Sequence, residues 1–312
     1  MNTETRGTNS SAPAGHASSH GAAGVFGLTL IALGAVAAIF FLTHLENRTA
    51  GAREPVEVAL LPDATAPIIA AALAADEKPE PGTGTFKGVV TFKGTPPKPK
   101  VVVTKGDAKV KPEDRAVCAA DELLGDELLV NEKADNAVAN VVVYLRKAPE
   151  GYKAPPPPDE PAVFDQKGCR FIPHVLVLRC DQKLLIKSGD PITHNTNIAG
   201  IRNSGFNQAI APSNRDGVAF GYKKPESVPV PVKCDFHPWM KAYHLPLDHP
   251  FATVTDDEGK FEIKGLPPGK YTFLVWHESP GYLNNKLAVE IKADKVTEQK
   301  LSFTAAQFKV GN

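Results

Sequence analysis

The chain has 312 residues, of which 42% are hydrophobic and 22% are charged, a composition that excludes a largely disordered protein. Its 35 basic and 35 acidic side chains cancel, which argues against a nucleic-acid-binding protein, because such proteins carry a basic excess. The four cysteines are too few for a disulfide scaffold, and the 25 Gly and 28 Pro favour turns and short strands over long helices.

The N-terminal quarter of the chain is predicted to form a tail, a membrane anchor and a linker. Residues 1–20 are polar and aperiodic, which predicts a disordered cytoplasmic tail. Residues 21–44 begin with 23 uncharged residues, enough for a helix to cross a bilayer core of about 30 Å. No small-residue cleavage site follows directly, so a single uncleaved transmembrane anchor is favoured over a cleaved signal peptide. Residues 45–83 are rich in Ala, Pro and Glu and are predicted to be a linker.

The pattern changes at residue 85 to short β-branched and aromatic runs that are bounded by Pro and Gly turns. No long amphipathic helix follows, so the sequence predicts an all-β fold of one or two antiparallel β-sandwiches. The expected strands are 85–92, 100–105, 139–147, 174–179, 183–188, 260–265, 270–277, 287–293 and 300–305.

One segment carries the residues of a soft-metal site. Cys234, His237 and Met240 are spaced three residues apart, and His194 lies 40 residues before the cysteine at the end of an expected strand. A thiolate, two imidazoles and a weak thioether form the ligand set of blue-copper sites, whereas a thioether is a poor zinc ligand. The protein fills every strong position, so no catalysis at the metal is expected. The alternative is a buried, inert Cys234 beside packed histidines.

This pattern resembles the cupredoxins, the plastocyanin- and azurin-like blue copper proteins. Residues 188–195 (Ser-Gly-Asp-Pro-Ile-Thr-His-Asn) resemble the family's first ligand segment, and residues 234–240 (Cys-Asp-Phe-His-Pro-Trp-Met) resemble its short ligand loop. The resemblance covers about 165–248 and implies a Greek-key sandwich that holds one type 1 copper ion. The implied ligands are His194, Cys234, His237 and, as the long axial ligand, Met240.

Several further residues are given roles around this site. By the same resemblance, Asn195 braces the ligand loop near the sulfur, and Pro238 stiffens that loop. Cys118 and Cys169 can form a disulfide in an oxidising compartment, but the connectivity cannot be read from sequence. Cys180 is expected to be a buried core residue within a strand. Among the other histidines, His174 is expected to be a hydrogen-bonded structural residue. His244, His249 and His277 are weak candidates for an auxiliary metal site.

A second resemblance concerns residues 252–304, which are similar to the carboxypeptidase regulatory-like (transthyretin-like) β-sandwich. The matching features are Asp-Asp-Glu-Gly-Lys-Phe and Leu-Pro-Pro-Gly-Lys-Tyr, with a turn expected to place Gly269 at positive φ. We therefore expect this sandwich to comprise residues 84–150 and 250–306, with the copper domain, residues 151–249, inserted between them. A tandem or a single merged sandwich is the competing layout.

Together these features favour a membrane-tethered copper protein that transfers single electrons and is not an enzyme. Redox protein donors and acceptors are expected to dock transiently near an exposed edge of His237. The charges flanking the apolar segment do not fix its orientation, so the globular part is placed on the periplasmic side of the inner membrane because of its metal chemistry. The alternatives are a non-redox binding or adhesion module and a copper storage or delivery protein.

Overall fold

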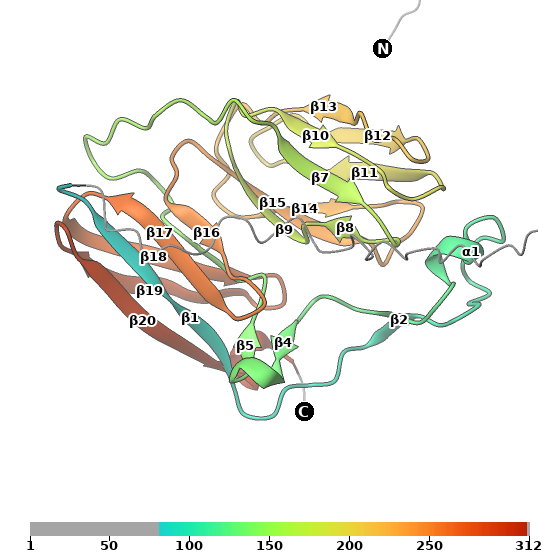
Figure 1. Cartoon of the computed structure of the whole chain (residues 1–312), viewed down its shortest axis with the longest axis horizontal. Coiled ribbons are helices and arrows are strands. Elements are labelled where there is room, and N and C mark those ends of the chain that lie inside the picture. The colour runs from blue at the N-terminus through green and yellow to red at the C-terminus, as the bar shows by residue number, and fades with distance from the viewer. Residues whose placement is uncertain (1–80, 311–312) are drawn as a thin grey trace, which may run out of the picture. The chain divides into compact units, whose positions relative to one another are not determined.

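Short β-strands are the main secondary structure of the computed structural model, which describes residues 81–310 (Figure 1). Within that range the helical elements are α1 (Arg115–Cys118), the 3-10 turn η1 (Glu132–Ala134) and α2 (Ala305–Phe308). The prediction of an all-β fold is therefore confirmed for these residues. The predicted tail and anchor and nearly all of the predicted linker lie outside them, and no helix within 81–310 is long and apolar enough to cross a membrane.

Two sheets are built from strands near the two ends of the described chain, and a shared apolar core lies between them. The first sheet has the order β17 (Lys260–Leu266), β1 (Gly84–Lys93), β5 (Ala137–Val138) and β4 (Val130–Asn131), and β20 (Val296–Thr304) also pairs with β1. The second sheet has the order β16 (Ala252–Val254), β6 (Val142–Tyr144), β18 (Gly269–His277) and β19 (Gly281–Ile291).

Strand β1 shows why this part of the sequence forms a sheet. Its alternate residues Phe86, Val90 and Phe92 point into the core, where the Phe86 and Phe273 rings lie 4.8 Å apart. Gly88, between Phe86 and Val90 on the same face, has no side chain. A Cβ there would lie 1.9 Å from the Gln299 carbonyl oxygen of β20. The missing side chain therefore allows β20 to approach β1 closely.

The other two sheets use only strands from the middle of the chain and enclose a second core. One has the order β13 (Val218–Phe220), β10 (Leu184–Ile186), β7 (Ala162–Gln166) and β8 (Phe171–Ile172). The other has the order β12 (Phe206–Ile210), β11 (His194–Ile198), β14 (Val230–Lys233), β15 (Lys241–Leu247) and β9 (Val175–Arg179). A small separate ladder joins β2 (Val101–Val103) to β3 (Leu123–Leu124).

A third apolar cluster links the two pairs of sheets. Tyr144 and Trp276 of β6 and β18 pack there against Leu245 of β15 and Val175 of β9. The described residues accordingly cluster as one compact unit. The nested domain boundaries stay a prediction. In the chain, the strands of the second pair of sheets, β7 to β15, come between the early and the late strands of the first pair.

The strand pairing differs from the expected antiparallel arrangement in three places. Strands β1 and β20, β7 and β10, and β9 and β15 pair in parallel. Each pair joins strands separated by intervening chain, and such crossover connections bring a strand back in the same direction. All nine expected strands are present, but β6 is shorter than expected and β19 begins six residues early, at Gly281, because β18 offers it a partner along this polar stretch.

Two local predictions were wrong. Gly269 was expected to have positive φ, but it begins β18 and Gly265, near the end of β17, holds that conformation instead, at φ 68°. Cys180 was expected within a strand and buried, but β9 ends at Arg179 and the thiol is half-buried. The Cys180 N–H donates to the Leu247 carbonyl at the edge of the sheet, which leaves its side chain at the rim of the core.

Candidate metal centre

The ligand loop is the tight connection between β14 and β15. The Cys234 N–H donates to the Met240 carbonyl at 3.2 Å, and the Met240 N–H donates to the His237 carbonyl at 2.9 Å. These bonds fold seven residues into a closed turn that buries the side chains of all three residues. Met240 and Cys234 belong to the same apolar core cluster. Pro238 lies exposed on the outside of the turn, where its fixed φ restricts the loop.

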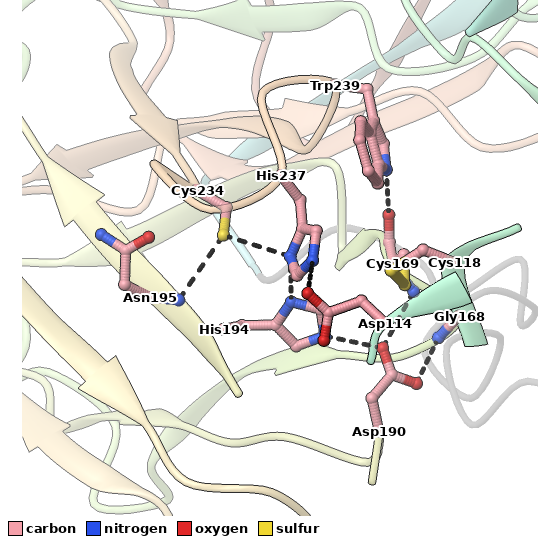
Figure 2. Close-up of a disulfide and its surroundings, with 10 residues drawn as sticks. All are labelled: Asp114, Cys118, Gly168, Cys169, Asp190, His194, Asn195, Cys234, His237 and Trp239. Carbon is pink, nitrogen blue, oxygen red and sulfur yellow. Dashed lines mark hydrogen bonds and ion pairs between the residues drawn. A yellow bond between two sulfur atoms is a disulfide. The ribbon is translucent and has the colours of Figure 1, made fainter. Parts of the chain in front are cut away.

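His194 reaches this loop from the beginning of β11. Strand β11 pairs with β14 through Asn197 opposite Lys233, so the start of β11 lies beside the first residue of the ligand loop. The donor atoms of His194, Cys234 and His237 all lie within 4.8 Å of one another, and all three side chains are buried (Figure 2). The two Nδ1 atoms are 2.9 Å apart, and the Cys234 Sγ lies 3.7 Å from the His237 Nδ1.

A carboxylate holds the far nitrogen of each imidazole. The His194 Nε2 lies 2.8 Å from Asp190 Oδ2, and the His237 Nε2 lies 3.2 Å from Asp114 Oδ2 (Figure 2). An ionised carboxylate only accepts hydrogen bonds, so each Nε2 carries a proton, and the Nδ1 atoms face each other in the interior of the site. Carboxylates orient metal-binding histidines in this way. The thiolate and two imidazole nitrogens therefore fit a copper ion in both donor type and direction.

The electrostatics of the site favour the ionised thiol. Burial opposes ionisation, but hydrogen bonds with His194 and His237 lower the pKa of Cys234 to about 6. Burial also disfavours a charged imidazole, yet bonding to Asp190 and Cys234 raises the pKa of His194 to about 9. The pKa of Asp190 is lowered against the effect of burial, by His194 and by the backbone N–H groups of Cys169 and Gly168. At neutral pH the site thus holds a thiolate, which is the form that binds metals.

Asn195 connects the ligand strand to the ligand loop. Its N–H lies 3.5 Å from the Cys234 Sγ, and its side-chain oxygen accepts from the Asp235 N–H at 2.6 Å. The Asp235 carboxylate in turn accepts from Asn195, Asn197 and Asn207 at 3.0, 2.8 and 3.2 Å. Sequence analysis missed Asp235 and its other two amide partners. The signal was present in part, because Asn195 and Asn197 alternate along β11 and therefore share one face of the strand.

A covalent link lies next to the two carboxylates. Cys118 and Cys169 form a disulfide with Cα atoms 5.3 Å apart, so the structure adopts the bridged alternative (Figure 2). The Cys169 N–H donates to Asp190 at 2.9 Å, and its carbonyl accepts from the Trp239 indole N–H at 3.3 Å. Cys169 also lies near Asp190 and His194 as a third potential ligand, but its sulfur is already bonded.

The main correction to the predicted site is that His237 has no exposed edge. His237 is only 2% exposed, because Asp114 and the chain around α1 cover its Nε2. Sequence analysis missed Asp114, and no local pattern indicates a partner 123 residues away. It also gave no role to Asp190, although an Asp four residues before a ligand histidine stood in the quoted motif.

The other histidines lie apart from this centre. His174 is confirmed as a hydrogen-bonded structural residue, because its Nε2 pairs with Glu278 and its Nδ1 lies 3.5 Å from Asp126. Burial lowers the pKa of His244 to about 3, and its Nδ1 is 2.9 Å from the Tyr222 hydroxyl. Among residues 81–310, neither group of potential ligands includes His244, His249 or His277.

Comparison with known proteins gives distant similarities only. No protein-family model matches the chain, and no curated protein matches it. Among solved structures, the copper-containing nitrite reductase from Thermus scotoductus SA-01 is 18% identical over 32% of this chain and 25% of its own, with a TM-score of 0.26. The chain thus spans about a quarter of the length of that enzyme.

Two smaller proteins are matched over most of their length. A reduced Cu(I) form of an amicyanin variant is 13% identical over 29% of this chain and 85% of its own, with a TM-score of 0.26. A purple cupredoxin from Nitrosopumilus maritimus is 13% identical over 28% of this chain and 99% of its own, with a TM-score of 0.24. These structural neighbours are cupredoxins, but similarity this low does not show that the present chain is one.

Proposed function

We propose that this chain binds one copper ion through His194, Cys234 and His237, with Met240 as the long axial ligand, and transfers single electrons. The observation that carries the proposal is the convergence of a thiolate and two imidazole nitrogens, all buried and within 4.8 Å of one another. When bound, copper supplies one-electron chemistry, because it cycles between its Cu(I) and Cu(II) states.

The surrounding residues support transfer rather than catalysis. The carboxylates of Asp190 and Asp114 fix both rings, and the amide network around Asp235 fixes the loop between two ligands. A site held this firmly has little freedom to rearrange, which suits a centre that gains and loses one electron. The protein supplies every strong ligand, so we propose that the chain is not an enzyme.

The cellular setting is part of the same proposal. The disulfide between Cys118 and Cys169 supports an oxidising compartment, in agreement with a periplasmic globular part. We propose that residues 21–44 tether it to the inner membrane, and that redox proteins dock on it transiently. We also propose that a Greek-key copper domain, residues 151–249, is inserted into a transthyretin-like sandwich formed by residues 84–150 and 250–306.

The test is optical and uses the purified full-length chain loaded with Cu(II). A thiolate-to-Cu(II) absorption band in the visible range is expected for the native chain and for Cys180→Ser, which removes the half-buried thiol outside the site. The band should disappear in Cys234→Ser. An absent band in the native chain, or a band that persists in Cys234→Ser, overturns copper ligation by Cys234. Slow electron self-exchange combined with easy loss of copper to a chelator would favour copper storage or delivery instead.

A further inference from the structure

The chain between β2 and β3 forms a small, self-contained cover over the metal centre. We define the cover segment as residues 104–121. Its ends are joined by the Gly106 N–H, which donates to the Ala119 carbonyl at 2.8 Å. The Arg115 side chain donates to the carbonyls of Asp107, Ala108 and Val110 at 3.0 to 3.2 Å. These internal bonds give a segment with one short helix a defined shape.

Apolar side chains and the disulfide attach the cover segment to the sandwich of the ligand loop. Val110, Cys118 and Ala119 are buried in the same core cluster as Cys234. The disulfide then joins Cys118 to Cys169, whose N–H donates to the Asp190 carboxylate at 2.9 Å. The disulfide thus connects the cover segment to Cys169, which in turn holds the Asp190 carboxylate that supports the His194 ring.

Asp114 is placed where an aspartate ordinarily stabilises its own helix. It is the N-cap residue of α1, and an N-cap carboxylate normally accepts from backbone N–H groups of the first turn. Here it makes no side-chain cap hydrogen bond. Its Oδ2 lies instead 3.2 Å from the His237 Nε2, and the residue is only 8% exposed. The carboxylate is therefore directed away from its own helix and toward the ligand ring.

We propose that Asp114 is a positioning residue for His237, and that the Cys118–Cys169 disulfide holds the cover segment in place so that Asp114 can act. The proposal rests on the proposed copper function. The carboxylate fixes the proton of His237 on Nε2 and turns Nδ1 toward Cys234 and His194. Because the same carboxylate covers Nε2, electrons cannot pass to a partner by direct contact with that atom while the cover is in place.

The main experiment compares Asp114→Ala with Asp114→Asn in the full-length chain. Removing a carboxylate partner of a ligand histidine typically weakens metal affinity by about 10- to 100-fold, and we expect that loss for Asp114→Ala. The amide oxygen of Asn still accepts from Nε2–H, so Asp114→Asn should recover most of the affinity. The matched control is Glu113→Ala, which removes the exposed neighbouring carboxylate of the same segment.

Two readouts separate positioning from a merely structural role. The Cu(II) electron paramagnetic resonance spectrum and the reduction potential should change in Asp114→Ala and stay native in Glu113→Ala. In the metal-free chain, ring ¹⁵N NMR should place the His237 proton on Nε2 in the native protein and lose that preference in Asp114→Ala. Native affinity, spectrum, potential and ring tautomer in Asp114→Ala overturn the proposal. A native chain without a copper band overturns the copper function instead, while the tautomer measurement still decides the role of Asp114.

The disulfide is tested with the Cys118→Ser, Cys169→Ser double variant. We expect it to reproduce the weaker copper affinity and the altered His237 tautomer of Asp114→Ala. If this variant fails to fold, Asp114→Ala with its disulfide intact still decides the positioning role. A folded double variant with native affinity and a native His237 ring overturns the part of the proposal that concerns the disulfide.

Discussion

Raising the pH above neutrality is expected to destabilise the folded protein through His174. This ring is buried between two carboxylates, with Nε2 paired to Glu278 and Nδ1 3.5 Å from Asp126. Burial favours the neutral ring, but the bonds and charges of Asp126 and Glu278 outweigh it and raise the pKa of His174 from 6.5 to about 9.

The size of the effect follows from the two pKa values of His174. Between 6.5 and about 9 the folded state holds a proton that the unfolded state has lost, so stability falls as pH rises. Each pH unit corresponds to about 1.4 kcal/mol, which gives a total loss on the order of 3 kcal/mol. This contribution is fully present below 6.5 and is lost once the pH passes about 9. The side chain is only 7% exposed, so solvent screens the pair weakly.

The assay is urea unfolding followed by tryptophan fluorescence, from about pH 6 to about pH 10, in the native chain and in His174→Gln. The native chain should lose about 3 kcal/mol of unfolding free energy relative to the variant across this range. His244→Gln is the matched control, because the pKa of buried His244 lies at about 3 and its ring stays neutral throughout. A difference between native and His174→Gln that stays constant with pH would refute the reasoning, as would an NMR titration midpoint for His174 at or below 6.5.

Two further substitutions test the packing and the ligand loop. Phe273→Ala removes a fully buried ring from the core between the first two sheets and should lower the free energy of unfolding in urea by about 3–5 kcal/mol. Ile201→Ala, at a position that is 69% exposed, should lower it far less. An equal loss in both variants would contradict the assignment of this core. Asp235→Ala removes the acceptor of three asparagine amides and should speed copper loss to a chelator by about tenfold. The control, Asp181→Ala, removes an exposed partner of Lys223 and should leave the rate of copper loss unchanged. Equal rates in native and Asp235→Ala would show that the amide network does not hold the loop.

The sequence predicts those parts of the structure that depend on local patterns. Alternation of apolar residues in β1 and β18 depends only on the period of two along a strand, so these strands are found at their expected positions. The ligand loop is equally local, because its three proposed ligands, Cys234, His237 and Met240, are separated from one another by two residues each. The prediction of His194 needed more, namely the chemical requirement of a blue-copper site for a second imidazole from elsewhere in the chain.

The missed features all depend on interactions between distant parts of the chain. Asp114 lies at the start of a four-residue helix, and nothing near it in the sequence indicates that its carboxylate faces His237. The parallel pairing of β1 with β20 likewise depends on the path of the chain between them. The predicted anchor, residues 21–44, lies outside the described residues and stays a prediction.

The central claim is that one sulfur and two imidazole nitrogens bind a single copper ion. Copper K-edge X-ray absorption on the loaded full-length chain tests it most directly, because the fine structure reports which atoms surround the metal. The account predicts one short copper–sulfur bond from Cys234 and two copper–nitrogen bonds from His194 and His237. In Cys234→Ser the short copper–sulfur bond should be absent. A shell of nitrogen and oxygen atoms alone around the copper of the native chain would contradict the claim.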